Sequence, residues 1–373
     1  MTPTALLRQR YHGLFKQVPK GLAGDEEAVH QMRVAGRRLR VALAMLAHKP
    51  DGRRASRAQM LLRELTRAAG HSRDLDVILG IYEKRLEGRH SPGPGRAALR
   101  RRLRGARARG RARMAEALLD LEISRLRRDL RRIVGGGVDE AFVVHLRLRE
   151  MRTEEGGAVL AGFAQLGGRF DPVALHALRR QARRLRYASE IGDLLTGEDS
   201  GAPALWKKLQ EKIGTINDHH VLAGWLEAAA TFYEMRGRGD LAAAARSERS
   251  WAVSRARALH RELIATDPAA IAQHALDAMN WTIVPIDPPS ADREASRHGR
   301  KEQGARRNAG AGAGRRRGAA IDRTSDSAPD QNPIQRRGSE GEPIAERGWA
   351  KRVSTNREQD RGEGPDEHGG STA

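Results

Sequence analysis

The chain has 373 residues, no cysteine, and 68 Lys and Arg against 47 Asp and Glu, which gives a formal net charge of +21 with histidine neutral. The missing cysteines exclude a disulfide framework, a thiol nucleophile and cysteine-ligated zinc. The charge favours anionic partners, namely nucleic acid, phosphate polymers or an acidic membrane surface. A genome that prefers arginine codons is an alternative source for part of this charge.

The sequence contains no apolar run that approaches the roughly 18 residues of a membrane span. The stretch from Thr4 to Val18 mixes Leu and Phe with Arg and Lys, and it lacks the apolar core and cleavage site of a signal peptide. We therefore expect a cytoplasmic protein that does not associate with membranes.

Hydrophobic periodicity is helical almost throughout residues 1–287. Aromatic residues make up only 4% of the chain, so the core must be built from Leu, Ala, Val and Ile, which suits helix-on-helix packing. Gly and Pro clusters punctuate the pattern. The apolar run 281–286 is expected to pack as an extended end. The pattern predicts helices over 24–47, 53–69, 73–88, 96–132, 138–165, 171–195, 203–213, 217–235, 238–265 and 268–279.

The stretch 288–373 has a different composition, rich in Gly, Arg, Ser, Asp and Glu and almost without periodic apolar residues. Such a segment cannot bury enough surface to offset its chain entropy and is expected to be disordered. It holds 17 basic and 14 acidic residues, so the folded part retains a net charge of +18. We expect one all-α domain over 1–287, with halves at about 20–135 and 138–287, followed by this tail.

Two motifs recur in the same order. The segment His30–Arg40 matches His176–Arg186 at an offset of 146, with a His, four Arg and a Leu in common. The segment Leu65–Val77 matches Leu209–Val221 at an offset of 144. Nearly equal offsets indicate a duplicated helical unit, whose halves meet near the triple glycine at 135–137.

The first motif places basic side chains on one helix face. Spacings of three and four residues confine its His and three of its Arg to an arc of about 80°. Apolar residues occupy the opposite side and anchor the helix. The two ladders are His30, Arg33, Arg37 and Arg40 in the first half, and His176, Arg179, Arg183 and Arg186 in the second.

Guanidinium groups are permanently charged and pair bidentately with phosphate oxygens. Like charges four residues apart cost an isolated helix about 0.2–0.5 kcal/mol per pair. A chain that carries this cost twice, in aligned places, is expected to offset it with a bound polyanion. The alternative is a solvated basic face that pairs with carboxylates of neighbouring helices.

Other polar groups have plainer interpretations. Asp74, Asp76, Asn217 and Asp218 follow glycines and are expected to cap helix N-termini and orient Arg side chains. His219 and His220 diverge by about 100° on a helix, so they do not chelate one ion, and we expect no metal site and no cofactor. Nine Arg residues between Arg96 and Arg113 either extend an anion path, contact nucleic-acid phosphates, or form an exposed helix.

The motifs that begin at Val29 and Leu175, each followed by its partner (Ser72–Val77 and Leu209–Asp218), resemble the two halves of a CHAD domain, the conserved histidine α-helical domain. The resemblance covers about residues 20–285. It implies two antiparallel helical bundles related by a pseudo-two-fold, with a basic central groove. No segment resembles the CYTH domain that is fused to some members of the family.

The resemblance also implies non-enzymatic binding of inorganic polyphosphate and association with polyphosphate granules. His30 and His176 are then phosphate contacts or structural residues, with a phosphohistidine or metal role as alternatives. The alternative functions are a protein that binds nucleic-acid backbones or organises granules, and an enzyme that processes polyphosphate. The polyphosphate-binding residues carried over are His30, Arg33, Arg37, Arg38, Arg40, His176, Arg179, Arg183, Arg184 and Arg186, with Lys207, Lys208 and Lys212 as weaker additions.

Overall fold

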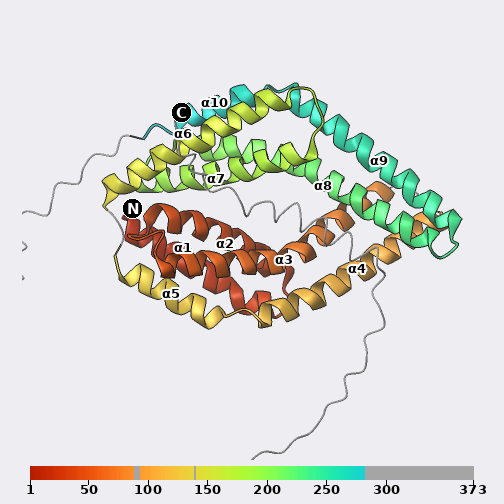
Figure 1. The fold of residues 1–373 in the computed structure, drawn as a ribbon, viewed down its shortest axis with the longest axis horizontal. Coiled ribbons are helices and arrows are strands. Elements are labelled where there is room, and N and C mark those ends of the chain that lie inside the picture. The colour runs from red at the N-terminus through yellow and green to blue at the C-terminus, as the bar shows by residue number, and fades with distance from the viewer. Residues whose placement is uncertain (88–92, 138–139, 282–373) are drawn as a thin grey trace, which may run out of the picture. The chain divides into compact units, whose positions relative to one another are not determined.

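The computed structural model describes residues 1–87, 93–137 and 140–281. Within these ranges the regular structure consists of ten α-helices without a β-strand (Figure 1), so the all-α class is confirmed. The expected two-fold relation between the halves and the central groove stay predictions. The helices are α1 Pro3–Leu22, α2 Glu26–Leu46, α3 Arg53–Leu86, α4 Pro94–Leu119, α5 Ile123–Gly135, α6 Ala141–Leu166, α7 Pro172–Thr196, α8 Ala202–Glu234, α9 Gly239–Ile264 and α10 Pro268–Ala278.

Helix α1 has no counterpart among the predicted helices. Pro3 occupies its first turn, and the Thr2 side chain caps it by accepting a hydrogen bond from the Ala5 amide. Leu7, Leu14 and other apolar side chains on one face are buried against α2 and α5. The helix is therefore held by its amphipathic face.

Two predicted breaks are wrong. The pairs of helices expected on either side of 70–72 and 214–216 are single helices, α3 with 34 residues and α8 with 33, each about 50 Å long. Glycine is tolerated inside a helix when packing supports it on both sides. Asp74, Asp76, Asn217 and Asp218 therefore lie inside helices and cap nothing.

The predicted helix 96–132 is instead two helices. Helix α4 ends at Leu119, and the backbone amide of Asp120 closes it by donating to the Glu116 carbonyl. Helix α5 resumes at Ile123 and buries Leu126 and Leu130. Neither Gly nor Pro stands at this turn, so the sequence carries no local signal for it.

Two hydrophobic cores hold the helices together, and both draw residues from the two halves of the chain. The larger core contains side chains of α1 to α3 and of α6 to α8, and helices α2 and α7 pack against each other. The smaller core joins the C-terminal parts of α3 and α8 to α4 and α9. The halves therefore share their interiors.

The C-terminal expectations fall mostly beyond the described ranges. Trp281, the first residue of the predicted extended end, is buried at 6% exposure, and its indole N–H donates to Asp193. Residues 282–286 and the predicted disordered tail lie outside the described residues. Among the helices of the described ranges, none has the length and apolarity needed to cross a membrane.

Candidate functional site

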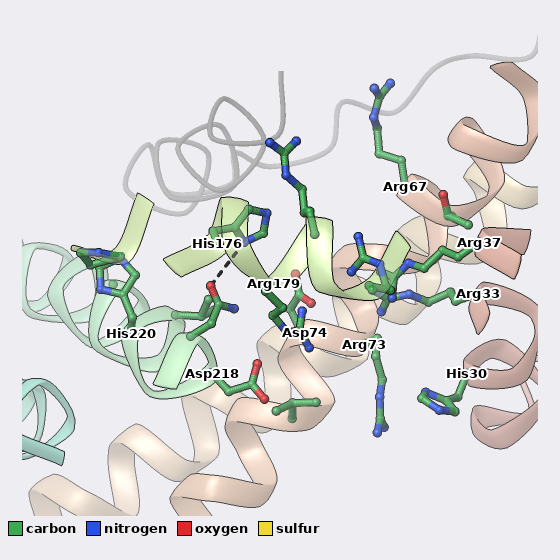
Figure 2. Close-up of a pocket in the computed structure, with 18 of the residues that line it drawn as sticks. His30, Arg33, Arg37, Arg67, Arg73, Asp74, His176, Arg179, Asp218 and His220 are labelled. Carbon is green, nitrogen blue, oxygen red and sulfur yellow. Dashed lines mark hydrogen bonds between the residues drawn. The ribbon is translucent and has the colours of Figure 1, made fainter. Parts of the chain in front are cut away.

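A pocket of about 930 Å³ lies where α2, α3, α7, α8 and α9 come together (Figure 2). Ten arginines and four carboxylates line it, which leaves a formal charge of +6 with histidine neutral. Its lining is thus far more positive than an average surface, and it suits a multiply charged anion.

Both basic ladders line this pocket, except for Arg186 of the second ladder. Figure 2 shows Arg33 and Arg37 extending from α2 toward the helix that carries His176 and Arg179. The ladders therefore converge on one space and do not point to opposite exteriors. The predicted residues in the lining are His30, Arg33, Arg37, Arg40, His176, Arg179 and Arg183.

In each repeat, a ladder arginine contacts the neighbouring helix at the glycine of the second motif. Arg33 is only 6% exposed and donates to the carbonyl oxygens of Ala69 and Gly70 at 3.3 Å each. In the second half, a Cβ on Gly214 would lie 3.1 Å from Nε and 3.2 Å from Nη2 of Arg179. At Gly214 only glycine leaves the guanidinium full room. In both repeats the ladder arginine thus contacts the helix of the second motif at its glycine.

The guanidinium groups of the two halves are close enough to affect one another electrostatically. Burial lowers the pKa of Arg183 well below its ordinary value, and the positive charges of Arg37 and Arg179 lower that pKa further. Arginine nevertheless keeps its proton. The pocket therefore brings together mutually repelling charges from both α2 and α7.

The pocket histidines have unequal surroundings. Burial and then the charge of Arg73 lower the pKa of His30, which favours its neutral form. His176 lies 3.4 Å from Asn217, measured from ring Nδ1 to amide Oδ1. Arg73 and Asn217 occupy equivalent positions in the two repeats, so one histidine has a cation beside it and the other has a neutral amide.

Two of the four lining carboxylates are Asp74 from α3 and Asp218 from α8, at equivalent positions of the two repeats. Burial raises the pKa of Asp218, Arg179 opposes this rise, and the negative charge of Asp74 adds to it. In the part of the chain that the structure describes, no three His, Asp or Glu side chains gather in a way that could hold a metal ion.

The sequence profile of the CHAD domain matches residues 5–227, more than half of the chain. This chain belongs to the CHAD family. The match covers α1 to α7 and most of α8, and thus includes both arginine ladders. Helices α9 and α10 lie beyond the matched residues.

Two curated relatives and one solved structure are similar to this chain. This CHAD chain is 31% identical over 203 residues to two uncharacterized proteins of Mycobacterium tuberculosis, MT2285 (strain CDC 1551 / Oshkosh) and Rv2226 (strain ATCC 25618 / H37Rv). The aligned part is 52% of this chain and 38% of theirs. The crystal structure of the CHAD domain from the plant Ricinus communis shares the fold, with a TM-score of 0.50 and 22% identity, over 76% of this chain and 91% of that one.

Six of the basic residues that were carried over from the CHAD resemblance lie outside the pocket. Glu190 pairs with Arg38 at 2.8 Å, with Arg186 at 3.2 Å and with Arg10 at 3.5 Å. Arg184 pairs with Glu155 at 2.7 Å. Arg38 and Arg186 therefore belong to an internal ion-pair cluster that joins α1, α2 and α7.

The three predicted lysines of α8 also lie away from the pocket lining. Lys207 pairs with Glu211 at 3.7 Å, and Lys212 donates to Thr266 at 3.1 Å. Lys208 is exposed. They extend the positive surface of the second half without entering the pocket.

The lining contains five further arginines that the sequence analysis does not assign to the site. Three form a stripe on α3, one lies on α7 and one on α9. A search for basic residues on the helical face that carries Gly70 and Asp74 could have found the α3 stripe, since the second motif already marks that face. The five are Arg63, Arg67, Arg73, Arg180 and Arg249.

The arginine-rich helix α4 mostly serves the fold. Arg96 pairs with the buried Glu248, and Arg104 pairs with Glu83. Arg107 and Arg111 both pair with Asp76 and Glu26. The expectation that Asp76 orients arginines is thus confirmed, and the carboxylates of neighbouring helices neutralise much of this helix.

Proposed function

We propose that this protein binds inorganic polyphosphate in the pocket between α2, α3, α7 and α8, without chemical conversion. The observation that carries the proposal is the convergence of the Arg33/Arg37 and Arg179/Arg183 ladders on one space with a surplus of positive charge. On α4, which is also rich in arginine, Arg96 and Arg107 pair with carboxylates of neighbouring helices.

A linear phosphate polymer suits these charges. Each guanidinium fork can pair with two oxygens of a phosphate, and these charge-assisted bonds are stronger than neutral ones. A flexible chain with a charge on every unit can follow two ladders that approach from opposite sides. Burial, and then the charges of Arg37 and Arg179, lower the pKa of Arg183. A bound polyanion would offset this repulsion between the guanidinium groups.

Nucleic acid is the alternative ligand, because its backbone offers the same phosphate chemistry. The high arginine content of α4 motivates this alternative, but its ion pairs with Glu83, Asp76 and Glu248 reduce the charge available for an extended contact. Competition separates the two ligands. At equal phosphate concentration, polyphosphate should displace single- or double-stranded DNA, and displacement of polyphosphate by DNA would favour the alternative.

We propose a binding role and no catalytic role. A pocket dominated by guanidinium groups stabilises the phosphate oxygens of the bound chain as it stands, whereas a hydrolase must stabilise its transition state more than its substrate. Incubation of the protein with long-chain polyphosphate and magnesium should leave the chain length unchanged. Shortening of the polymer would show an enzyme.

The direct test is titration with long-chain polyphosphate. Changing Arg33, Arg37, Arg179 and Arg183 together to Ala should abolish most of the affinity and flatten its dependence on salt. The matched control removes four exposed arginines that lie outside the pocket lining, namely Arg53, Arg54, Arg101 and Arg128. Equal losses in both variants would show that net charge alone, and not the pocket, determines binding.

We also propose that the protein associates with polyphosphate granules in cells. A tagged copy should form foci in cells that store polyphosphate and spread evenly in cells that cannot make it. The four-arginine pocket variant should stay diffuse in both. Foci that persist without polyphosphate would point to another partner.

A further inference from the structure

The two rims of the pocket differ in charge, although the repeats that build them are related. On α3 the exposed lining residues are Met60, Arg63 and Arg67. Arg63 and Arg67 are four residues apart, so they project from the same side of the helix. Across the described ranges, no carboxylate forms an ion pair with either arginine.

The opposite rim is nearly neutral. Its exposed lining residues come from α8 and α9, and they are His220, Glu227 and Arg249. Arg249 forms an ion pair with Glu227. Any positive charge that α9 brings to the pocket is therefore balanced at the rim itself.

The difference between the two rims is also seen at equivalent positions of the two repeats. With the offset of 144, Arg63 corresponds to Lys207 and Arg67 corresponds to Glu211. Lys207 and Glu211 pair with each other at 3.7 Å and do not line the pocket. The first repeat thus places two exposed arginines at the mouth, beside the half-buried Glu64. The second repeat keeps the corresponding Lys207 and Glu211, with Lys208 beside them, outside the lining.

From this asymmetry we infer that Arg63 and Arg67 form an electrostatic entry rim that guides the polyanion into the pocket over α3. The inference rests on the proposed polyphosphate binding. Exposed charges act mainly on the association rate, because they attract the ligand before contact and remain hydrated afterwards. The buried side chain of Arg33 and the half-buried ones of Arg179 and Arg183 instead hold the polymer once it has entered, and they set the dissociation rate.

Association and dissociation kinetics with labelled long-chain polyphosphate test the inference. We expect Arg63→Glu with Arg67→Glu to slow association about tenfold or more at low salt, and to leave the dissociation rate within about twofold. The control is Lys207→Glu with Lys208→Glu, which makes the same change in net charge on exposed positions of α8. This control should slow association far less.

A second variant separates charge from shape. Arg63→Lys with Arg67→Lys keeps both charges but removes the planar forks, so it should associate at the unchanged rate. Equal slowing in the α3 and α8 variants, or an effect confined to dissociation, would overturn the inference while leaving polyphosphate binding intact. If the wild-type protein did not bind the polymer at all, the proposed function would be refuted, and this inference with it.

Discussion

The guanidinium of Arg179 lies directly over Gly214, so close that a Cβ at that glycine would come within 3.1 Å of Nε. Arg33 makes the corresponding crossing in the first repeat, where it bonds the carbonyls at the equivalent glycine. The repeated His-Arg motif and the repeated Gly-Asp motif are therefore two sides of one contact. This contact positions the ladders that we propose to bind polyphosphate.

Gly214→Ala should weaken polyphosphate binding several-fold without destabilising the fold. The new methyl group displaces the flexible end of Arg179 by a few tenths of an ångström, while alanine favours the helix by about 1 kcal/mol over glycine. Thermal unfolding and polyphosphate titration together measure this split. Gly80→Ala, at a helical glycine of α3 with open space around its Cβ, is the control and should leave affinity unchanged. A loss of stability in Gly214→Ala would contradict the account.

Arg183→Gln should stabilise the ligand-free protein and weaken binding. The lowered pKa of Arg183 means that its positive charge opposes folding, so its removal should raise the melting temperature by about 2 °C. Affinity should fall about tenfold to a hundredfold, since a charge-assisted hydrogen bond contributes about 1.5–3 kcal/mol. Arg53→Gln, at an exposed position, is the control and should change neither the melting temperature nor the affinity. A lower melting temperature in Arg183→Gln would contradict the conclusion that the charge of Arg183 opposes folding.

Asp218→Asn should bind polyphosphate more tightly than the unchanged protein at pH 7, because a negative charge that faces the phosphates is removed. The raised pKa of Asp218 means that the folded state takes up a proton at higher pH than the unfolded chain does. Its contribution to stability therefore grows as the pH falls through that raised pKa toward 3.8. Chemical denaturation at several pH values should show a stability gain on acidification in the unchanged protein that Asp218→Asn lacks. The exposed Asp51→Asn should behave like the unchanged protein.

Arg38→Ala should affect the fold more than the ligand. Arg38 and Arg186 share Glu190, which is largely buried, and loss of one partner should cost about 1–3 kcal/mol of the free energy of unfolding. Its affinity for polyphosphate should stay within about threefold of the unchanged value, a margin that corresponds to less than 1 kcal/mol. Arg37→Ala, one position away on the same helix but facing the pocket, should show the reverse pattern. A comparable loss of affinity in both variants would show that Arg38 also takes part in binding.

The helical class, the duplication and the core of the site follow from local patterns in the sequence. The spacing of His30, Arg33 and Arg37 fixes them on one helix face, and that face is where the pocket lies. The helix α1 could have been predicted as well, since Leu7, Leu14 and Val18 have helical spacing.

Tertiary contacts determine those parts of the fold and of the site that local sequence patterns do not predict. Gly70 and Gly214 resemble helix ends in sequence, yet both lie inside long helices, where Arg33 bonds the Gly70 carbonyl and Arg179 packs against Gly214. Whether an arginine faces a ligand or a carboxylate depends on the partner helix. Arg37 and Arg38 are adjacent and project about 100° apart on α2. Arg37 lines the pocket, whereas Arg38 meets Glu190 from α7.

The most direct test of the central claim compares the two ladders one at a time. Arg33→Ala with Arg37→Ala removes the first ladder, and Arg179→Ala with Arg183→Ala removes the second. If both ladders hold one polymer, each double variant should lose most of the affinity for long-chain polyphosphate, measured by calorimetric titration. If each variant instead bound with undiminished affinity at half the stoichiometry, the ladders would be separate sites, and the shared pocket would be refuted.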